Sequence, residues 1–308
     1  MAKTAFCFPG QGSQEVGMGK AMATASPAAR DVYAAAADAL GFDVARVCFD
    51  GPLERLSATE VTQPALITTE VACLAAVRER GFEPDFVVGH SVGEYAALVA
   101  AGSLLAADAV RLVRERGLAM AEAAAESPGA MAAVIGLADD EVERLCVELE
   151  GVWPANYNCP GQLVVSGTEE GVASLIAAAQ AAGARRAVRL NVSGGFHSPL
   201  TASAERRLRP ALEAVAFAAP VTPFLSTVTC KLEEAEAIVP VLVRQLTAPV
   251  RFTQAIEELV RRGVTRFVEV GAGSVLTGLI RRIDRSVEPI PVASPDGLDR
   301  LAEAIERA

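Results

Sequence analysis

The chain has 308 residues, of which 51% are hydrophobic and 21% charged, and its 28 basic and 38 acidic side chains give a net charge of −10. This length allows about two domains of roughly 100–200 residues each, and the composition excludes a disordered chain. No block of like charges stands out, so we expect no nucleic-acid partner. The charge-free stretches, such as 95–107 and 214–230, are too short or too interrupted to cross a membrane.

Targeting signals and cysteine usage point to the cell interior. Lys3 is the one basic residue before Pro9-Gly10, and the apolar stretch between them is too short for a signal-peptide core, so we expect a soluble cytoplasmic protein. The six cysteines include no C-x-x-C pair, which predicts small buried hydrophobic side chains rather than disulfides or a zinc site. Because the histidines are His90 and His197 alone, a multi-histidine metal site is impossible, and we expect no metal.

The first part of the chain alternates short apolar segments with helical ones. In order, the predicted elements are a strand at 4–8, a Gly-rich turn at 9–14, a helical stretch through 33–40, a helix at 63–80, a strand at 86–88, a turn at 89–93 and a helix at 92–101. Short apolar strands that alternate with helices are typical of an α/β protein with a parallel sheet.

The middle of the chain follows a different order. The predicted elements are a strand at 129–137, a helix at 139–149 capped by Asp139 or Asp140, strands at 152–157 and 162–166 around a turn at 158–161, a helix at 169–182 and a strand at 186–192. This β-α-β-β-α-β order is the split ferredoxin-like pattern, complete in about 65 residues. It predicts a small domain at 127–193, bounded by Gly-containing turns, inserted into a larger one at 1–126 and 194–308.

The last part returns to α/β order. The predicted elements are a helix at 253–262, a strand at 267–270, a turn at 271–273, a helix at 275–283, a strand at 287–292 and a helix at 298–308. Neither Gly10-x-Gly12 nor Gly271-x-Gly273 completes G-x-G-x-x-G, and no Walker lysine follows either turn. We therefore expect no nucleotide to bind through these turns.

Gly89-His90-Ser91-Val92-Gly93 is a G-x-S-x-G pattern between a predicted strand and a predicted helix. This placement is typical of a nucleophile elbow, whose sharp turn lifts the serine hydroxyl clear of the sheet. The N-terminus of the following helix then directs free N–H groups at developing negative charge. The alternative is a Gly-rich turn with an ordinary serine.

A serine nucleophile needs a base, and the sequence offers two histidines. His90 is adjacent to Ser91 and should point away from it, so we expect it to pack or to form hydrogen bonds. His197, in the loop 193–199, is then the base by elimination. No Asp or Glu near either motif stands out as an orienting carboxylate, so we expect a backbone carbonyl or an amide side chain to hold the imidazole tautomer.

Segments along nearly the whole chain match one known family. They are PGQGSQ (9–14), TQPAL (62–66), GHSVGEYAAL (89–98), RG (116–117), GAMAAVIGL (129–137), NCPGQ (158–162), VSGGFHSPL (192–200), VRQLTAPVRF (243–252) and EVGAGSVLTGLI (269–280). On these segments the chain resembles the malonyl-CoA:acyl carrier protein transacylases and is similar to polyketide acyltransferase domains. The resemblance implies an α/β-hydrolase-like large subdomain with a parallel sheet and an inserted ferredoxin-like α+β subdomain.

The resemblance also implies catalytic roles. Ser91 would attack a malonyl thioester while His197 takes its proton. The backbone N–H groups of Gln11 and Val92 would form the oxyanion hole. The main-chain carbonyl of Gln245 would orient His197 in place of an acidic residue.

Substrate contacts follow in the same way. The resemblance assigns Arg116 to the free malonyl carboxylate, and its planar guanidinium suits a bidentate grip in an enclosed site. The residues alone favour a surface arginine in an ion pair at that position. Gln63 and Asn158 would line the pocket. Phe196 directly before His197 resembles malonyl-selective members of the family.

The implied reaction is a ping-pong transfer from malonyl-CoA, through a malonyl-serine, to the phosphopantetheine thiol of a holo acyl carrier protein. It needs no cofactor beyond the coenzyme A thioester. Two arginine clusters, 185/186/189 and 281/282/285, are candidates for binding an acidic carrier protein, and plain solvated surface is the alternative for each. No heptad pattern is present, so we expect a monomer.

Three other readings stay open. A trans-acting polyketide acyltransferase of another acyl specificity would share most of these motifs. A serine thioesterase or hydrolase would share the elbow, but it has no use for a carboxylate clamp. A catalytically silent carrier-binding protein would have no need of Ser91, His197, Gln11 and Arg116 together.

Overall fold

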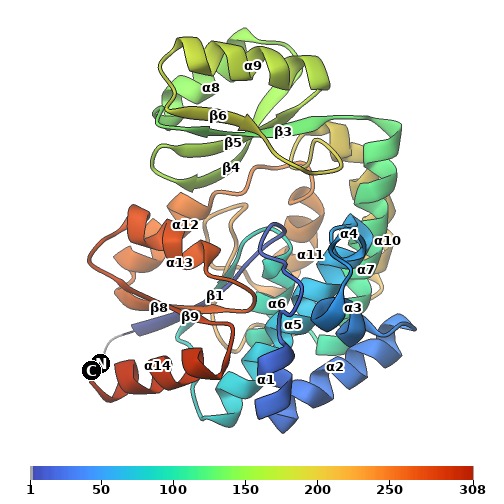
Figure 1. Cartoon of the computed structure of the whole chain (residues 1–308), viewed down its shortest axis with the longest axis vertical. Coiled ribbons are helices and arrows are strands. Elements are labelled where there is room, and N and C mark those ends of the chain that lie inside the picture. Colours follow the sequence, from blue (N-terminus) through green and yellow to red (C-terminus); the bar gives the residue numbers. More distant parts are fainter. Residues whose placement is uncertain (1–2, 308) are drawn as a thin grey trace.

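A computed structural model of the chain describes residues 3–307, which form two sheets with helices around them (Figure 1). The larger sheet has five strands in the order β7-β2-β1-β8-β9, and every neighbouring pair is parallel. Its strands are β1 (Lys3–Phe8), β2 (Phe86–Gly89), β7 (Phe224–Leu225), β8 (Val264–Val270) and β9 (Glu288–Val292). The central strands β1 and β2 are almost wholly buried, as expected of parallel strands that helices cover on both faces.

Twelve α-helices accompany this sheet within the described residues. They are α1 (Lys20–Ala25), α2 (Pro27–Leu40), α3 (Val44–Asp50), α4 (Leu53–Leu56), α5 (Thr59–Glu79), α6 (Gly93–Ala100), α7 (Ala106–Glu126), α10 (Ala202–Glu213), α11 (Ala235–Arg244), α12 (Phe252–Arg261), α13 (Val275–Ile283) and α14 (Pro295–Glu306). Helix α5 is buried over most of its length between α2 and α7. A Cβ atom on Gly117 of α7 would lie 2.7 Å from the Glu60 Cα, so this glycine permits the close approach of α7 to α5.

The smaller sheet has the order β4-β5-β3-β6, and all its neighbouring pairs are antiparallel. Its elements are β3 (Ala130–Ile135), α8 (Asp139–Glu148), β4 (Val152–Cys159), β5 (Gln162–Gly167), α9 (Glu169–Ala181) and β6 (Arg186–Arg189). In Figure 1 this sheet lies above the parallel one, with α8 and α9 on its outer face. The two sheets confirm the predicted fold class, an α/β subdomain with a parallel sheet and an inserted ferredoxin-like α+β subdomain.

Several details of the predicted elements are wrong. Helix α8 begins after Ala138 with no side-chain cap, and Asp139 and Asp140 lie in its first turn, where their charges face the positive helix end. Strand β4 continues through Cys159, so the predicted turn at 158–161 is shorter. Strand β6 ends at Arg189 instead of Val192.

The two sheets join where β4 meets the segment before α12. The Tyr157 N–H donates to the Val250 carbonyl at 2.8 Å, and the Val250 N–H donates to the Ala155 carbonyl at 2.8 Å. The chain enters the smaller sheet after α7 and leaves it after β6. On this basis we propose residues 127–193 as the limits of the inserted subdomain.

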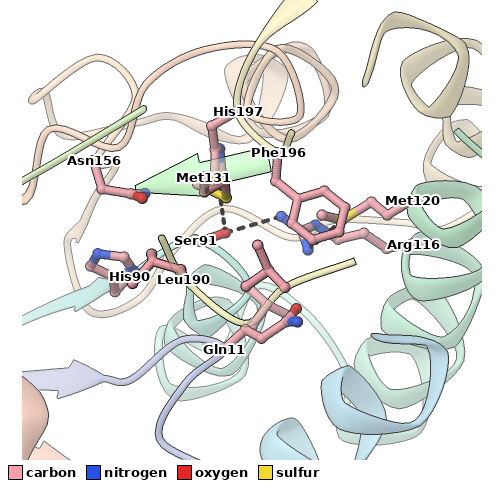
Figure 2. Close-up of a pocket in the computed structure, with 12 residues that line it drawn as sticks. Gln11, His90, Ser91, Arg116, Met120, Met131, Asn156, Leu190, Phe196 and His197 are labelled. Atoms are coloured by element: carbon pink, nitrogen blue, oxygen red, sulfur yellow. Dashed lines mark hydrogen bonds between the residues drawn. The ribbon is translucent and has the colours of Figure 1, made fainter. Parts of the chain in front are cut away.

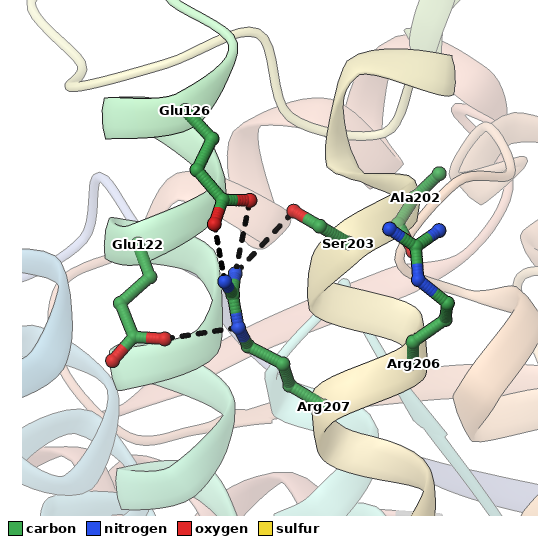
Figure 3. Close-up of polar contacts among 6 residues, drawn as sticks. All are labelled: Glu122, Glu126, Ala202, Ser203, Arg206 and Arg207. Atoms are coloured by element: carbon green, nitrogen blue, oxygen red, sulfur yellow. Dashed lines mark hydrogen bonds and ion pairs between the residues drawn. The ribbon is translucent and has the colours of Figure 1, made fainter.

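Helices α7 and α10 are joined by polar contacts at the surface (Figure 3). Arg207 of α10 pairs with Glu126 and, at 3.1 Å, with Glu122 of α7. Its Nη1 also lies 3.4 Å from the Ser203 Oγ. These exposed pairs are screened by salt and contribute little stability. They do connect the helix that carries Arg116 to the helix that follows the His197 loop.

Two further observations bear on the sequence predictions. Among residues 3–307, no helix is both long enough and apolar enough to cross a membrane. The six cysteines are free thiols in the described chain, and all except the half-buried Cys230 are buried.

Candidate active site

Ser91 lies in a tight turn between β2 and α6. Its backbone φ is 53°, in the left-handed region that residues other than glycine rarely adopt. The flanking glycines allow the turn to close. A Cβ on Gly89 would lie 2.2 Å from the Gly93 carbonyl carbon, and a Cβ on Gly93 would lie 2.2 Å from the Phe8 carbonyl oxygen. The G-x-S-x-G spacing is therefore a steric requirement of a turn that raises the Ser91 hydroxyl above the sheet.

His197 lies directly against this hydroxyl. Its Nε2 is 2.8 Å from the Ser91 Oγ, and its Nδ1 is 2.9 Å from the Gln245 carbonyl and 3.1 Å from the Ala248 carbonyl. Because carbonyl oxygens only accept hydrogen bonds, these two assign the proton to Nδ1. Nε2 is then free to accept the serine proton.

Burial lowers the pKa of His197 to about 3, and the positive charge of Arg116 acts in the same direction. The imidazole is therefore neutral near pH 7, which is the state that a general base needs. Any negative charge placed on Arg116 would offset that guanidinium and make His197 a stronger base.

The lowered pKa predicts how stability depends on pH. Because the folded pKa lies below the unfolded value near 6.5, the unfolded chain binds a proton that the folded protein does not. The free energy of unfolding should therefore fall as pH decreases from 6.5 toward 3, with a contribution from His197 of up to about 1.4 kcal/mol per pH unit.

Urea unfolding of the wild type and of His197→Gln between pH 7 and pH 4 checks this slope. The variant should lose less stability than the wild type over this range. Parallel curves for the two proteins would contradict the assignment of a neutral, buried His197.

Arg116 lies on α7 with 1% of its surface exposed. Its Nη2 donates to the Ser91 Oγ and to the Gln245 Oε1, both at 3.1 Å. Its Nη1 donates to the Gln63 Oε1 at 2.8 Å and lies 3.1 Å from the Met120 sulfur. These partners are all neutral, and its Nε finds no partner among the described residues. A buried guanidinium without an anionic partner is costly, and it suits a site whose ligand brings the negative charge.

A cavity of about 90 Å³ opens around Ser91, lined by residues of the turns after β1 and β2, of helix α7, of strands β3 and β4, and of the loop after β6. In Figure 2 the Ser91 hydroxyl lies between His197 and Arg116, with a hydrogen bond to each. The cavity is lined by Gln11, His90, Ser91, Val92, Arg116, Met120, Met131, Asn156, Leu190, Val192, Phe196 and His197. An adjoining hollow of about 180 Å³ shares Gln11, His90, Asn156 and Leu190 with it and extends to the start of α13.

The predicted pocket residues take different places. Gln11, Val92 and Phe196 line the cavity around Ser91. Gln63 lines neither hollow, because it is fully buried behind Arg116 and holds that side chain from α5. Asn158 lines the adjoining hollow, where its Oδ1 lies 3.0 Å from the His90 Nε2.

Sequence reasoning missed several residues around the serine. Met120, Met131, Asn156, Leu190 and Val192 line the cavity. Met131 and Val192 lie in the family-matching segments 129–137 and 192–200, which gave them no role, and no sequence pattern marks the other three. Leu190 and Val192 lie in the segment that follows the end of β6 at Arg189.

Sequence reasoning also missed Glu94. It lies three residues after Ser91, at the start of α6, and has no exposed surface. Its Oε2 accepts a 2.6 Å hydrogen bond from the Gln245 Nε2. Burial raises the pKa of Glu94 to about 7, against the opposing effect of its hydrogen-bond donors. A single acidic residue within the otherwise uncharged Gly93–Ala100 segment was the available signal.

Comparisons with known proteins agree on one family. Residues 5–299 match the acyl transferase domain family. The malonyl CoA-acyl carrier protein transacylase of Bacillus subtilis strain 168 is 42% identical, over 99% of this chain and 98% of the relative. That of Escherichia coli K12 is 44% identical, over 99% and 100%. A malonyl-transacylase solved in complex with a holo type II PKS acyl-carrier protein superposes with a TM-score of 0.96 at 41% identity, over 98% of this chain and 100% of that one.

Proposed function

The chain belongs to the acyl transferase domain family, and from that premise we propose that it transfers a malonyl group from malonyl-CoA to the thiol of a holo acyl carrier protein. One observation supports this function above the alternatives. The base His197 and the buried cation Arg116 converge on the same Ser91 oxygen, at 2.8 and 3.1 Å. A hydrolase of simple esters needs the first contact and has no use for the second.

The first half-reaction loads the enzyme. The Ser91 Oγ attacks the thioester carbonyl as His197 Nε2 takes its proton, and a tetrahedral oxyanion forms. The backbone N–H groups of Gln11 and Val92, whose residues line the cavity, are our candidates for stabilising that oxyanion. The intermediate collapses with cleavage of the carbon–sulfur bond. Coenzyme A leaves with the proton from His197, and the malonyl group remains as an ester of Ser91.

The second half-reaction runs the same steps in reverse with a new thiol. The phosphopantetheine thiol of the carrier protein gives its proton to His197 and attacks the malonyl ester. When the intermediate collapses, the Ser91 oxygen leaves and recovers the proton from His197. The carrier then holds the malonyl group as a thioester.

Arg116 gives this chemistry its acyl specificity. None of its hydrogen-bond partners is an anion, so the free malonyl carboxylate supplies a direct one. The same ion pair offsets the charge that lowers the pKa of His197, so the substrate strengthens the base that acts on it. An acyl group without a carboxylate provides neither effect.

Intact-mass analysis tests the whole proposal. The purified protein is incubated with malonyl-CoA, quenched and mapped by peptide. We expect a malonyl adduct on Ser91 that disappears when holo carrier protein is added. Free malonate, with no trapped adduct and no carrier acylation, would indicate a hydrolase instead.

We further propose that Arg281 and Arg285 bind the acidic carrier protein. Both side chains are exposed on or just after α13, whose first turns line the adjoining hollow. Charge reversal at both positions should lower kcat/KM for the carrier roughly 10-fold or more at low salt, because positive charge near the site speeds encounter with an acidic partner. Loading from malonyl-CoA should not change.

The other exposed cluster provides the comparison. Arg185 and Arg186 lie on the outer edge of the smaller sheet. Charge reversal at these two positions distinguishes which of the two surfaces binds the carrier protein. Equal losses in loading and in carrier transfer for the Arg281/Arg285 variant would contradict a docking role there.

A further inference from the structure

The buried carboxylate of Glu94 is not used in the mechanism above, although it lies two hydrogen bonds from Arg116. Its Oε1 accepts from the Thr227 N–H at 2.6 Å, the Thr227 hydroxyl at 2.8 Å and the Ser226 hydroxyl at 3.1 Å. Its Oε2 accepts from the Gln245 Nε2 at 2.6 Å. Four donors thus converge on the two carboxyl oxygens, and they favour the ionised form against the burial that raises the pKa of Glu94.

The Gln245 side chain transmits this arrangement to Arg116. Its Nε2 donates to Glu94 and, at 3.0 Å, to the Ser91 carbonyl, so both amide hydrogens are directed at acceptors. Its Oε1 therefore faces the Arg116 Nη2, from which it accepts at 3.1 Å. In the opposite amide orientation an N–H would face the guanidinium and the oxygen would face two acceptors.

We propose that Glu94 is a positioning residue for the carboxyl-bearing acyl group, because its carboxylate fixes the Gln245 amide in the orientation that holds Arg116 toward Ser91. This inference rests on the proposed function, since it assigns Arg116 to the acyl carboxylate. Glu94 touches neither the substrate nor the reacting atoms. Its influence passes through one amide, which also leaves the Gln245 main-chain carbonyl in place for His197.

Glu94→Gln isolates this role with little change in volume. The new amide must keep its oxygen toward the Thr227 N–H, so its NH₂ group faces the NH₂ group of Gln245. Two NH₂ groups cannot bond to each other, so either this contact is lost or the Gln245 amide turns an N–H toward the guanidinium. Either outcome removes the acceptor that orients Arg116.

The measurement is the rate of Ser91 acylation by malonyl-CoA and by acetyl-CoA, followed by intact mass at several donor concentrations. We expect the malonyl-to-acetyl ratio of kcat/KM to fall roughly 10- to 100-fold in Glu94→Gln, since a lost charge-assisted hydrogen bond has an effect of that order. Most of the loss should be in the KM for malonyl-CoA. A role limited to folding would lower kcat/KM for malonyl-CoA and for acetyl-CoA by the same factor.

Glu269→Gln is the matched control. Glu269 is also fully buried and accepts from the backbone N–H groups of Leu276 and Thr277 at 2.9 and 2.7 Å, away from Arg116. Its variant should keep the wild-type donor ratio. If Glu94→Gln does not fold, Gln245→Met tests the same link, because it keeps the carbonyl that holds His197 and removes the amide. The ratio should fall as in Glu94→Gln.

The outcomes separate the two proposals. An unchanged ratio in Glu94→Gln or in Gln245→Met, with a wild type that forms the malonyl adduct, would overturn the positioning role and leave the proposed function standing. A wild type that forms no malonyl adduct would overturn the proposed function itself.

Discussion

Replacing Ser91 by alanine should abolish the malonyl adduct and lower transfer to the carrier protein by about 10⁴-fold or more. The reason is that the substitution removes the one oxygen on which the base and the buried cation converge. Intact-mass analysis after incubation with malonyl-CoA, together with a carrier acylation assay, measures both effects. Circular dichroism spectra should confirm that the variant is folded.

Ser103→Ala is a suitable control for the loss of a buried serine. Its hydroxyl donates to the Ala218 carbonyl at 2.6 Å, outside the cavity around Ser91. That variant should load malonyl at the wild-type rate. A malonyl adduct that persists in Ser91→Ala, at whatever residue, would refute the nucleophile assignment.

Replacing Arg116 by alanine should lower the rate of malonyl loading by roughly 10²- to 10³-fold, because the substrate carboxylate loses a buried bidentate partner. Acetyl loading should fall far less, since acetyl has no carboxylate. The change in charge partly offsets this smaller loss: without the guanidinium, the pKa of His197 should rise toward its ordinary value and the base should become stronger. The malonyl-to-acetyl ratio of the loading rates should therefore fall by nearly as much as the malonyl rate itself.

Two further variants sharpen this test. Arg116→Lys keeps the positive charge without the planar guanidinium, and its rate of malonyl loading should lie between those of the wild type and Arg116→Ala. Arg111→Ala removes an exposed arginine of the same helix, which pairs with Asp108 at 3.2 Å. It should leave the rates of malonyl and acetyl loading unchanged. Equal losses of malonyl and acetyl loading in Arg116→Ala would show that the guanidinium acts on folding or on the serine rather than on the carboxylate.

The sequence predicts the fold class because its strongest patterns belong to the strands and their adjoining turns. The run Phe86–Val88 and the β-α-β-β-α-β order of the middle segment each allow few architectures. Three long helices, α7, α10 and α11, were not predicted. Gly117 lies within α7, Pro210 within α10 and Pro240 within α11, and both residue types usually indicate a break. Tertiary packing outweighs this local preference, as the close contact of Gly117 with α5 shows.

The sequence likewise predicts only part of the candidate site. Ser91 and His197 could be selected from the sequence because the elbow pattern is local and the histidines are few. Residues that meet through space could not. Neither the contact of Gln63 with Arg116 nor that of Glu94 with Gln245 leaves a trace in spacing, since 53 and 151 positions separate the partners. An acidic residue in the first turn of a helix ordinarily faces solvent and the helix dipole, so the burial of Glu94 was unexpected.

The backbone at Ser91 and His197 has a consequence for how this protein can change. Both residues have positive φ, at 53° and 58°, and each such residue costs about 1 kcal/mol or more relative to ordinary helical backbone. Glycine would relieve that strain at either position and would remove the chemistry with it. At His197 that relief is outweighed, because glycine would open a cavity and leave the Gln245 and Ala248 carbonyls without their donor. Selection for thermal tolerance alone therefore favours the inactive sequence at Ser91. Variants screened for heat resistance should be required to retain turnover, because here the most stable protein and the working enzyme are different molecules.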